Sequence, residues 1–364
     1  MKYMNEYRDP ELAKQYLEEI KKTVTQPWSI MEVCGGQTHS LVKNGIIDML
    51  PTAVTMIHGP GCPVCVTPLN LIDKAIHLAL NENVILCSFG DMLRVPGSKI
   101  NLLEAKAKGA DIRILYSPLE AVKIAQDNPD REVVFFAVGF ETTAPANALS
   151  VIHAHRRKLD NYSILASHVL VPPAIKAVID DDESKIDGFL AAGHVCTIMG
   201  NAEYYPISEK HDVPIVVTGF EPLDVLQGIL MVIRQLEQSK AEVENQYSRI
   251  VREEGNPDAQ EMIFEVFEIK NQIWRGIGEI PDSGYAVKKK YSNFDANAKF
   301  SITIEEAPEH PDCISGQIMK GIKKPFQCAQ FGKKCKPSFP LGAPMVSSEG
   351  ACAAYYHFSG LVEA

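Results

Sequence analysis

The stretch Ala53-Val54-Thr55-Met56-Ile57-His58-Gly59-Pro60-Gly61-Cys62-Pro63-Val64-Cys65 joins an apolar run to a loop of glycine, proline and cysteine. The run Ala53–Ile57 is short and apolar on both sides, which is typical of a strand buried in a parallel sheet. Glycine and proline then interrupt the strand. The stretch therefore predicts a buried strand that is followed directly by two thiols, Cys62 and Cys65.

Similar apolar runs lie on both sides of this strand and alternate with segments of helical length. Before about residue 130 they are Ile30–Val33, Val84–Cys87 and Ile112–Leu115. Beyond it they are Val133–Val138, Ser163–Ala166, Gly188–Ala191 and Pro214–Val217. Such alternation is typical of βαβ units. We therefore expect an α/β fold with two tandem parallel-sheet domains, over residues 30–130 and 131–222.

The remaining segments have a different character. Asp9 followed by Pro10 predicts the start of an amphipathic helix in segment 1–29. Segment 223–279 has helical periodicity and is predicted to be helical. Segment 280–364 is rich in proline and glycine and contains four cysteines. A segment with so little core of its own usually needs a metal centre to hold it, so we expect an iron-sulfur region there.

The composition limits the classes of function. The chain has 364 residues, with 46 acidic and 36 basic side chains and a net charge of −10. This charge argues against nucleic-acid or membrane binding. No apolar signal core or bilayer-length apolar stretch is present, so we expect a cytoplasmic protein. Nine cysteines in that setting indicate metal or redox chemistry rather than a disulfide scaffold.

Four thiols lie in the loop-rich C-terminal segment. They are Cys313, Cys328, Cys335 and Cys352, with the spacing C-x14-C-x6-C-x16-C. Four such thiols suit a 4Fe-4S cluster or a structural zinc, and the absence of a C-x2-C pair here favours the cluster. Unrelated buried thiols are the alternative. Cys352 is expected in the first turn of a capped helix, whose dipole favours a thiolate.

The Cys62–Cys65 pair forms a C-x-x-C motif with an internal proline. This spacing resembles that of thiol-disulfide exchange motifs, whose sulfurs are close enough to pair. Half of a zinc site is the alternative, but no second such pair lies nearby to complete it. Gly59 and Gly61 precede the motif and are candidates for the binding loop.

Cys34 follows the predicted strand Ile30–Val33. If this strand is a neighbour of Ala53–Ile57, Cys34 and the C-x-x-C pair face one crevice at the carboxyl edge of the sheet. Gly35 and Gly36 permit close approach to the backbone, and amides near a helix start favour an anionic ligand or thiolate. His39 is a ligand, a proton donor or a histidine satisfied at the start of the helix.

Other predicted strand ends also carry polar side chains. They include Asp91 and Arg94, Glu141, His168, His194 and Glu221. Singly these residues suit turns and caps, but their number favours a functional cleft between the domains. The chain contains no phosphate-binding loop, dinucleotide fingerprint or nucleophile elbow, so it is not predicted to be an ordinary nucleotide enzyme or serine hydrolase.

Seven motifs together resemble those of the HypD family of hydrogenase maturation proteins, across essentially the whole chain. They are Cys34-Gly-Gly-Gln-Thr-His39, Gly59-Pro-Gly-Cys-Pro-Val-Cys65, Phe89-Gly-Asp-Met-Leu-Arg-Val-Pro-Gly-Ser98, Gly139-Phe-Glu-Thr-Thr143, Gly219-Phe-Glu-Pro-Leu-Asp224, Trp274-Arg-Gly-Ile-Gly278 and Met345-Val-Ser-Ser-Glu-Gly-Ala-Cys-Ala-Ala-Tyr355. Two positions depart from the pattern. Gln37 stands where members often carry histidine, and Ser315 stands where many carry cysteine.

The resemblance implies a scaffold for assembling the Fe(CN)2CO unit of nickel-iron hydrogenase. It implies Cys34 as the iron-binding thiolate, Cys62 and Cys65 as a redox pair, and the four C-terminal cysteines as ligands of a 4Fe-4S cluster. A HypC-type chaperone and a HypE-type cyanide donor would be its partners. The alternatives are a stand-alone thiol-disulfide or electron-transfer protein, which would work without partners, and a structural iron-sulfur protein, which would tolerate loss of Cys34.

Overall fold

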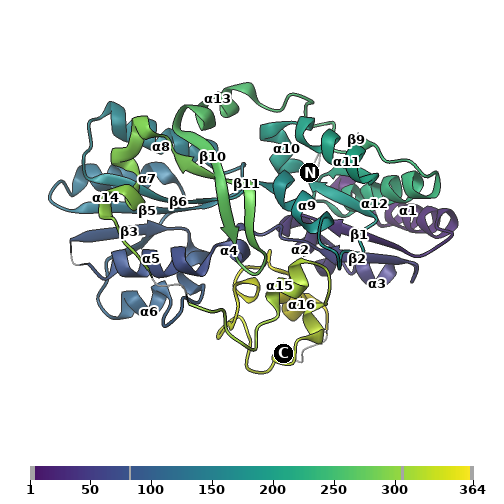
Figure 1. The fold of residues 1–364 in the computed structure, drawn as a ribbon. Coiled ribbons are helices and arrows are strands. Elements are labelled where there is room, and N and C mark those ends of the chain that lie inside the picture. The colour runs from purple at the N-terminus through teal and green to yellow at the C-terminus, as the bar shows by residue number, and fades with distance from the viewer. Residues whose placement is uncertain (1–4, 82, 305–306, 361–364) are drawn as a thin grey trace.

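A computed structural model describes residues 5–81, 83–304 and 307–360 of the chain. It contains two parallel sheets, each flanked by helices, with an antiparallel hairpin and a C-terminal region between them (Figure 1). We call the two sheets with their helices lobe 1 and lobe 2. The predicted α/β class with two parallel sheets is confirmed.

Lobe 1 has a five-stranded sheet in the order β2-β1-β7-β8-β9, and every neighbouring pair is parallel. Its strands are β1 (Trp28–Glu32), β2 (Val54–His58), β7 (Gly188–Ala192), β8 (Ile215–Thr218) and β9 (Val243–Asn245). Its helices are α1 (Pro10–Thr23), α2 (Gly35–Lys43), α3 (Ile46–Met49), α10 (Gly193–Met199), α11 (Tyr205–His211) and α12 (Pro222–Glu237). The short helix α4 (Pro63–Val66) follows β2, and α9 (Val171–Ile179) enters the lobe from lobe 2.

Lobe 2 has a four-stranded parallel sheet in the order β4-β3-β5-β6. Its strands are β3 (Val84–Ser88), β4 (Ile112–Ile114), β5 (Glu132–Gly139) and β6 (Tyr162–His168). The accompanying helices are α5 (Leu69–Ala79), α6 (Leu102–Ala107), α7 (Pro118–Asp127), α8 (Ala144–Arg156), α13 (Pro257–Val266) and α14 (Ala296–Phe300). Strands β3 and β6 are buried along their whole length, as expected when helices cover both faces.

The strands are not grouped into the two tandem domains, residues 30–130 and 131–222, that the sequence predicts. The chain forms β1 and β2, then all four strands of the lobe 2 sheet, and returns to the lobe 1 sheet at β7. Strand β1 then pairs with both β2 and β7. Apolar periodicity identifies strands but carries no information about which strands become neighbours. For that reason the eight predicted strands all form, whereas their predicted grouping was wrong.

Segment 223–279 is only partly helical, so its prediction was wrong beyond α12 and α13. Strand β10 (Phe267–Trp274) pairs antiparallel with β11 (Gly278–Val287) in a hairpin that lies between the lobes (Figure 1). Gly276 and Gly278 adopt positive φ values of 77° and 114° in the turn, which a side chain would resist. Much of β10 is exposed, so its strand pattern is weak in the sequence.

The N-terminal helix forms as predicted. The Asp9 carboxylate accepts a hydrogen bond of 2.8 Å from the amide of Glu11, and Pro10 occupies the first turn of α1. Ile20 of α1 is completely buried in the same apolar cluster as Ile229 of α12. This contact closes one face of lobe 1.

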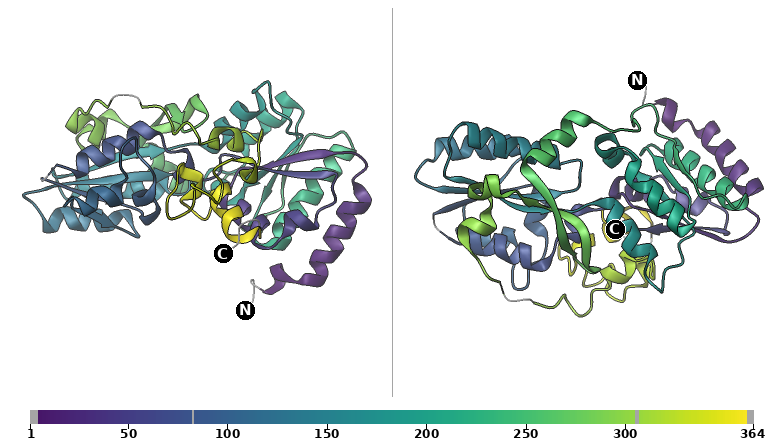
Figure 2. Two further views of the ribbon diagram at one scale, coloured as in Figure 1. Left: turned by 90° about the horizontal axis from the view of Figure 1, so that it is seen from below. Right: turned by 45° about the horizontal axis from the view of Figure 1, so that its top comes forward.

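The C-terminal region contains α15 (Ser315–Met319), α16 (Ala351–Phe358) and long loops. Short 3₁₀ helices also occur in the described residues. They are η1 (Asn5–Arg8), η2 (Gly90–Arg94), η3 (Ala202–Tyr204), η5 (Pro325–Gln327) and η6 (Ala343–Met345), and the longer η4 (Lys289–Phe294) follows β11. Figure 2 shows the region lying between the two lobes. None of the described helices is long and apolar enough to cross a membrane.

Candidate functional site

The parallel pairing of β1 with β2 places two thiol-bearing loops at one sheet edge. The amide of Gly35 donates a hydrogen bond of 2.8 Å to the carbonyl of Gly61, which joins the loops directly. A Cβ atom on Gly61 would stand 2.2 Å from the backbone nitrogen of Cys34. Only glycine permits this approach, so Gly61 serves the packing of the two loops. Cys34, Cys62 and Cys65 belong to one buried cluster.

Cys62 and Cys65 form a disulfide with a Cα–Cα distance of 5.2 Å. Cys62 is the N-cap of α4, and Pro63 occupies the first position of that helix. Both cysteines are 3% exposed. The two sulfurs of the C-x-x-C motif are therefore paired with each other. The structure does not show them as half of a zinc site.

Cys34 is the N-cap of α2 and is 1% exposed. Burial raises the pKa of its thiol, and the nearby carboxylates of Glu349 and Glu32 raise it further. Its Sγ lies 3.5 Å from Nδ1 of His194 at the start of α10. Burial lowers the pKa of His194 to about 4, so the imidazole is neutral at physiological pH. The resting site thus holds a protonated thiol beside a neutral imidazole.

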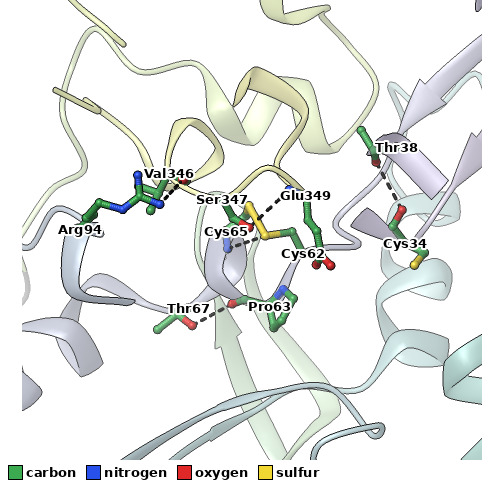
Figure 3. Close-up of a disulfide and its surroundings, with 10 residues drawn as sticks. All are labelled: Cys34, Thr38, Cys62, Pro63, Cys65, Thr67, Arg94, Val346, Ser347 and Glu349. Atoms are coloured by element: carbon green, nitrogen blue, oxygen red, sulfur yellow. Dashed lines mark hydrogen bonds between the residues drawn. A yellow bond between two sulfur atoms is a disulfide. The ribbon is translucent and has the colours of Figure 1, made fainter. Parts of the chain in front are cut away.

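Glu349 approaches this site from the C-terminal region. In Figure 3 its side chain lies between the Cys62–Cys65 disulfide and Cys34. A Cβ atom on Gly35 would stand 2.5 Å from the Cβ atom of Glu349, so Gly35 makes room for it. Solvent reaches part of this side chain, but burial of its carboxyl raises the pKa of that carboxyl, and the nearby Asp91 carboxylate raises it further. Glu349 lies within the motif Met345–Tyr355, but no spacing or periodicity in the sequence marks it as a site residue.

The other two candidate glycines are also tightly packed. A Cβ atom on Gly59 would stand 2.8 Å from the carbonyl oxygen of Glu32, and one on Gly36 would stand 3.1 Å from the ring of Phe220. The amide of Gly59 donates a hydrogen bond of 2.8 Å to that same Glu32 carbonyl. Both glycines therefore shape the sheet edge around Cys34.

His39 lies on α2 and faces the C-terminal region. Its Nδ1 is 3.3 Å from the carbonyl oxygen of Ser348, and its ring packs edge-to-face on Phe358 with 5.1 Å between centroids. Gln37, where family members often carry histidine, donates hydrogen bonds to Thr218 and Ala191 of neighbouring strands. The histidine in contact with Cys34 is instead His194, one of the polar residues at strand ends that were predicted to line a cleft between the domains.

The four C-terminal cysteines line one small pocket of about 20 Å³ that is partly open to solvent. Ser315 lines the same cavity. The amide of Leu341 donates to the Sγ of Cys335 at 3.4 Å. Cys352 lies in the first turn of α16 as predicted, although the N-cap is Gly350, which has no side chain to cap the helix.

The electrostatics of this cavity favour protonated thiols. Burial raises the pKa of Cys352, and the negative charge of the three other cysteines raises it further. A bound cation would relieve this cost, because it inverts the local preference for the neutral thiol. Among the described residues, no group of three or more histidine, cysteine, aspartate or glutamate side chains is placed to hold a metal ion. The four thiols therefore line the cavity but do not converge on one point.

The two remaining cysteines belong to the core. Cys87 in β3 and Cys196 in α10 are both completely buried, and burial raises the pKa of each thiol to about 12. Neither has the glycine-rich strand end that surrounds Cys34. They therefore serve as internal controls for experiments on Cys34.

Comparison with known proteins gives a consistent match over the whole chain. A family model named HypD, described as "Hydrogenase formation hypA family", matches residues 11–359. The chain is 48% identical over 375 residues to the hydrogenase maturation factor HypD of Rhodobacter capsulatus, covering 99% of each chain. It is 47% identical over 368 residues to HypD2 of Bradyrhizobium diazoefficiens (98% of this chain, 97% of the relative) and 44% identical over 366 residues to HypD of Escherichia coli (98% of each).

The fold and the site define a two-lobed α/β protein with thiols at a sheet edge and four more in a C-terminal cavity. Together with the full-length matches, this places the chain in a known class. It belongs to the HypD family of hydrogenase maturation factors.

Proposed function

We propose that the chain is a scaffold on which the Fe(CN)2CO unit of nickel-iron hydrogenase is assembled, with Cys34 as the thiol that binds the iron. The observation that carries this proposal is the setting of Cys34: a thiol at a parallel sheet edge, between Gly61 and Gly35, beside a disulfide and a neutral His194. A low-spin iron with cyanide and carbonyl ligands favours soft thiolate donors.

The raised pKa of Cys34 fits a site that is inert until its cargo arrives. A protonated, buried thiol is a poor nucleophile, so it resists alkylation and oxidation. Arrival of iron displaces the thiol proton, because the metal stabilises the thiolate. Glu349 lies nearby with a raised pKa and is suited to receive that proton.

Assembly also requires partners and electrons. An iron unit that must move onward needs a ligand set that is shared with another protein rather than closed within one chain. We assign the additional ligand to a HypC-type chaperone and the source of cyanide to a HypE-type donor. The Cys62–Cys65 pair would be the redox-active group, cycling between dithiol and disulfide.

Cys313, Cys328, Cys335 and Cys352 would hold a 4Fe-4S cluster in the C-terminal cavity. When bound, such a cluster supplies one-electron transfer. The protein's own contribution is to keep four thiols around one cavity and to direct the Leu341 amide at one of their sulfurs. Ser315 offers a hydroxyl rather than a fifth thiol.

The test compares Cys34→Ala with the core control Cys87→Ala, each purified anaerobically with a HypC-type partner. Infrared spectra report metal-bound CO and CN, and visible absorption reports the cluster. Loss of the CO and CN bands in Cys34→Ala alone, with the cluster retained, is the expected result. Bands of wild-type intensity in Cys34→Ala would contradict the assignment of iron to this thiol.

A stand-alone thiol-disulfide protein remains the alternative function, and the disulfide itself favours it. Such a protein would reduce a generic disulfide substrate without partners and would not need Cys34. The same Cys34→Ala variant therefore separates the two functions, because only the scaffold loses its activity.

A further inference from the structure

We infer that Glu32, His58 and Tyr355 are positioning residues. They form a buried hydrogen-bonded chain through which the position of helix α16 sets the conformation of the Cys34 loop. The inference deepens the proposed function, since it rests on Cys34 as the working thiol. It assigns a role to three residues that are not among the cysteines of the proposed function.

The chain begins at the Cys34 loop itself. The carboxylate of Glu32 accepts a hydrogen bond of 3.0 Å from the backbone amide of Cys34 through Oε2. Its other oxygen, Oε1, accepts a hydrogen bond from the Thr38 hydroxyl, one turn into α2. Glu32 is completely buried. One side chain therefore fixes both the residue that bears the thiol and the first turn of the helix that follows it.

The next link crosses to the neighbouring strand. Glu32 and His58 are register partners at the ends of β1 and β2, so their side chains lie side by side on one face of the sheet. His58 Nδ1 lies 2.7 Å from Glu32 Oε1. His58 is 2% exposed. Its ring therefore has a fixed orientation, with the second nitrogen directed away from the carboxylate.

The last link reaches the C-terminal region. His58 Nε2 lies 3.1 Å from the hydroxyl of Tyr355, whose ring packs edge-to-face on the imidazole with 5.4 Å between centroids. Tyr355 lies three residues after Cys352 in α16, so both project from neighbouring positions of one helix. A displacement of α16 that moves Cys352 therefore also moves the hydroxyl that holds His58.

The hydrogen-bonded chain leaves none of its side-chain atoms unpaired. In the described structure every side-chain nitrogen and oxygen of these three residues has a hydrogen-bond partner. Leaving a buried polar group without a hydrogen-bond partner costs free energy. The site is therefore expected to have either the complete hydrogen-bonded chain or a rearranged Cys34 loop. Two distinct arrangements of this kind are what allows one region to set the conformation of another.

The experiment measures the alkylation rate of Cys34 by peptide mass spectrometry of the full chain, with Cys87 and Cys196 as internal references. Tyr355→Phe removes one hydroxyl from the buried chain. Tyr356→Phe is the matched control, since Tyr356 is the adjacent residue and its ring packs on Phe331. We expect Tyr355→Phe to raise the Cys34 rate about fivefold, the change produced by losing one hydrogen bond of ~1 kcal/mol from a local opening equilibrium. Tyr356→Phe should leave the rate unchanged.

Cys352→Ser supplies the second arm, and it needs no assumption about which metal is bound. It should raise the Cys34 rate in the wild-type background and add nothing in the Tyr355→Phe background, because the link is already broken. His58→Asn, whose side-chain amide can donate to Glu32 from the position of Nδ1 but which has no atom at the position of Nε2, should reproduce the Tyr355→Phe effect.

Two results would overturn the inference. One is an unchanged Cys34 rate in Tyr355→Phe. The other is an equal rise at Cys87 and Cys196, which would mean general loosening. Neither readout involves cyanide, carbonyl or maturation activity. Failure of the inference is therefore distinguishable from failure of the proposed function, which is tested by the infrared bands.

Discussion

The Sγ atom of Cys34 lies 3.5 Å from Nδ1 of His194, although the two residues are 160 positions apart in the chain. His194 also packs its ring against Phe220, with 5.1 Å between centroids. These contacts make His194 one wall of the thiol site. The sheet order explains the contact, because β1 and β7 are neighbours and both strands end at the same edge.

We predict that His194→Ala exposes the Cys34 thiol. Removing the ring opens space beside the sulfur, so alkylation of Cys34 should become about tenfold faster and the free energy of unfolding should fall by ~1–3 kcal/mol. The control is His39→Ala, because His39 contacts Ser348 and Phe358 instead. Equal rates in the two variants would contradict a specific role for His194.

Gly61→Ala should disturb the Cys34 loop through steric overlap alone. The added Cβ atom would stand 2.2 Å from the backbone nitrogen of Cys34, and backbone cannot rotate away as a side chain can. We expect a loss of ~1–3 kcal/mol in the free energy of unfolding, measured by urea denaturation. Gly90→Ala is the control, since its Cβ atom would make only an ordinary contact at 3.7 Å.

The Cys62–Cys65 disulfide gives a simple thiol count. In denaturant, the oxidised chain should show seven alkylatable cysteines, and the reduced chain should show all nine. The two additional labels should map to Cys62 and Cys65. Nine labelled cysteines before reduction would show that the pair does not form a disulfide in solution.

Loss of one C-terminal thiol should release the proposed iron centre. We expect Cys335→Ser to abolish stoichiometric iron and acid-labile sulfide, and to increase proteolysis of the segment from Cys313 to Cys352, because metal binding and folding are coupled there. Cys196→Ser is the control from the core. Stoichiometric zinc without sulfide in the wild-type protein would contradict a 4Fe-4S cluster.

Glu141 should make the stability depend on pH. It is buried at the end of β5, and burial raises the pKa of its carboxyl from 4.5 to about 8. The folded state therefore keeps a proton that the unfolded chain releases near pH 4.5, so the free energy of unfolding should fall as pH rises from 4.5 to 8. Glu141→Gln should remove this slope and stabilise the protein at pH 7 by on the order of 3 kcal/mol.

The control for this prediction is Glu268→Gln, which changes an exposed carboxylate on β10 and should preserve the wild-type slope. Thermal unfolding measured at several pH values between 4.5 and 8 provides the comparison. A wild-type pH profile in Glu141→Gln would show that this carboxyl does not carry the dependence.

The sequence was sufficient for the local parts of the molecule. Apolar runs located eight strands, and the glycine-rich ends of β1 and β2 pointed to Cys34 and the C-x-x-C pair. These features depend on neighbouring residues only. Hairpin β10–β11 was missed because its exposed positions leave little alternation to detect.

The rest of the site depends on long-range contacts. His194 reaches Cys34 only because the chain returns to lobe 1 at β7, and Glu349 reaches Gly35 only because the C-terminal region lies between the lobes. Neither contact leaves a periodic or spacing signal around the residues involved. The helical histidine His39, which is close in sequence, was therefore an easier candidate than His194, which is close in space.

The return of the chain to lobe 1 has a consequence for the nascent protein on the ribosome. Cys34 is synthesised 160 residues before His194, which at about 5–20 residues per second is an interval of roughly 10–30 s. During that time β1 has no β7 to pair with, and the thiol that is sealed in the finished fold lies open. The growing chain therefore needs reducing surroundings to keep this cysteine intact until lobe 1 closes.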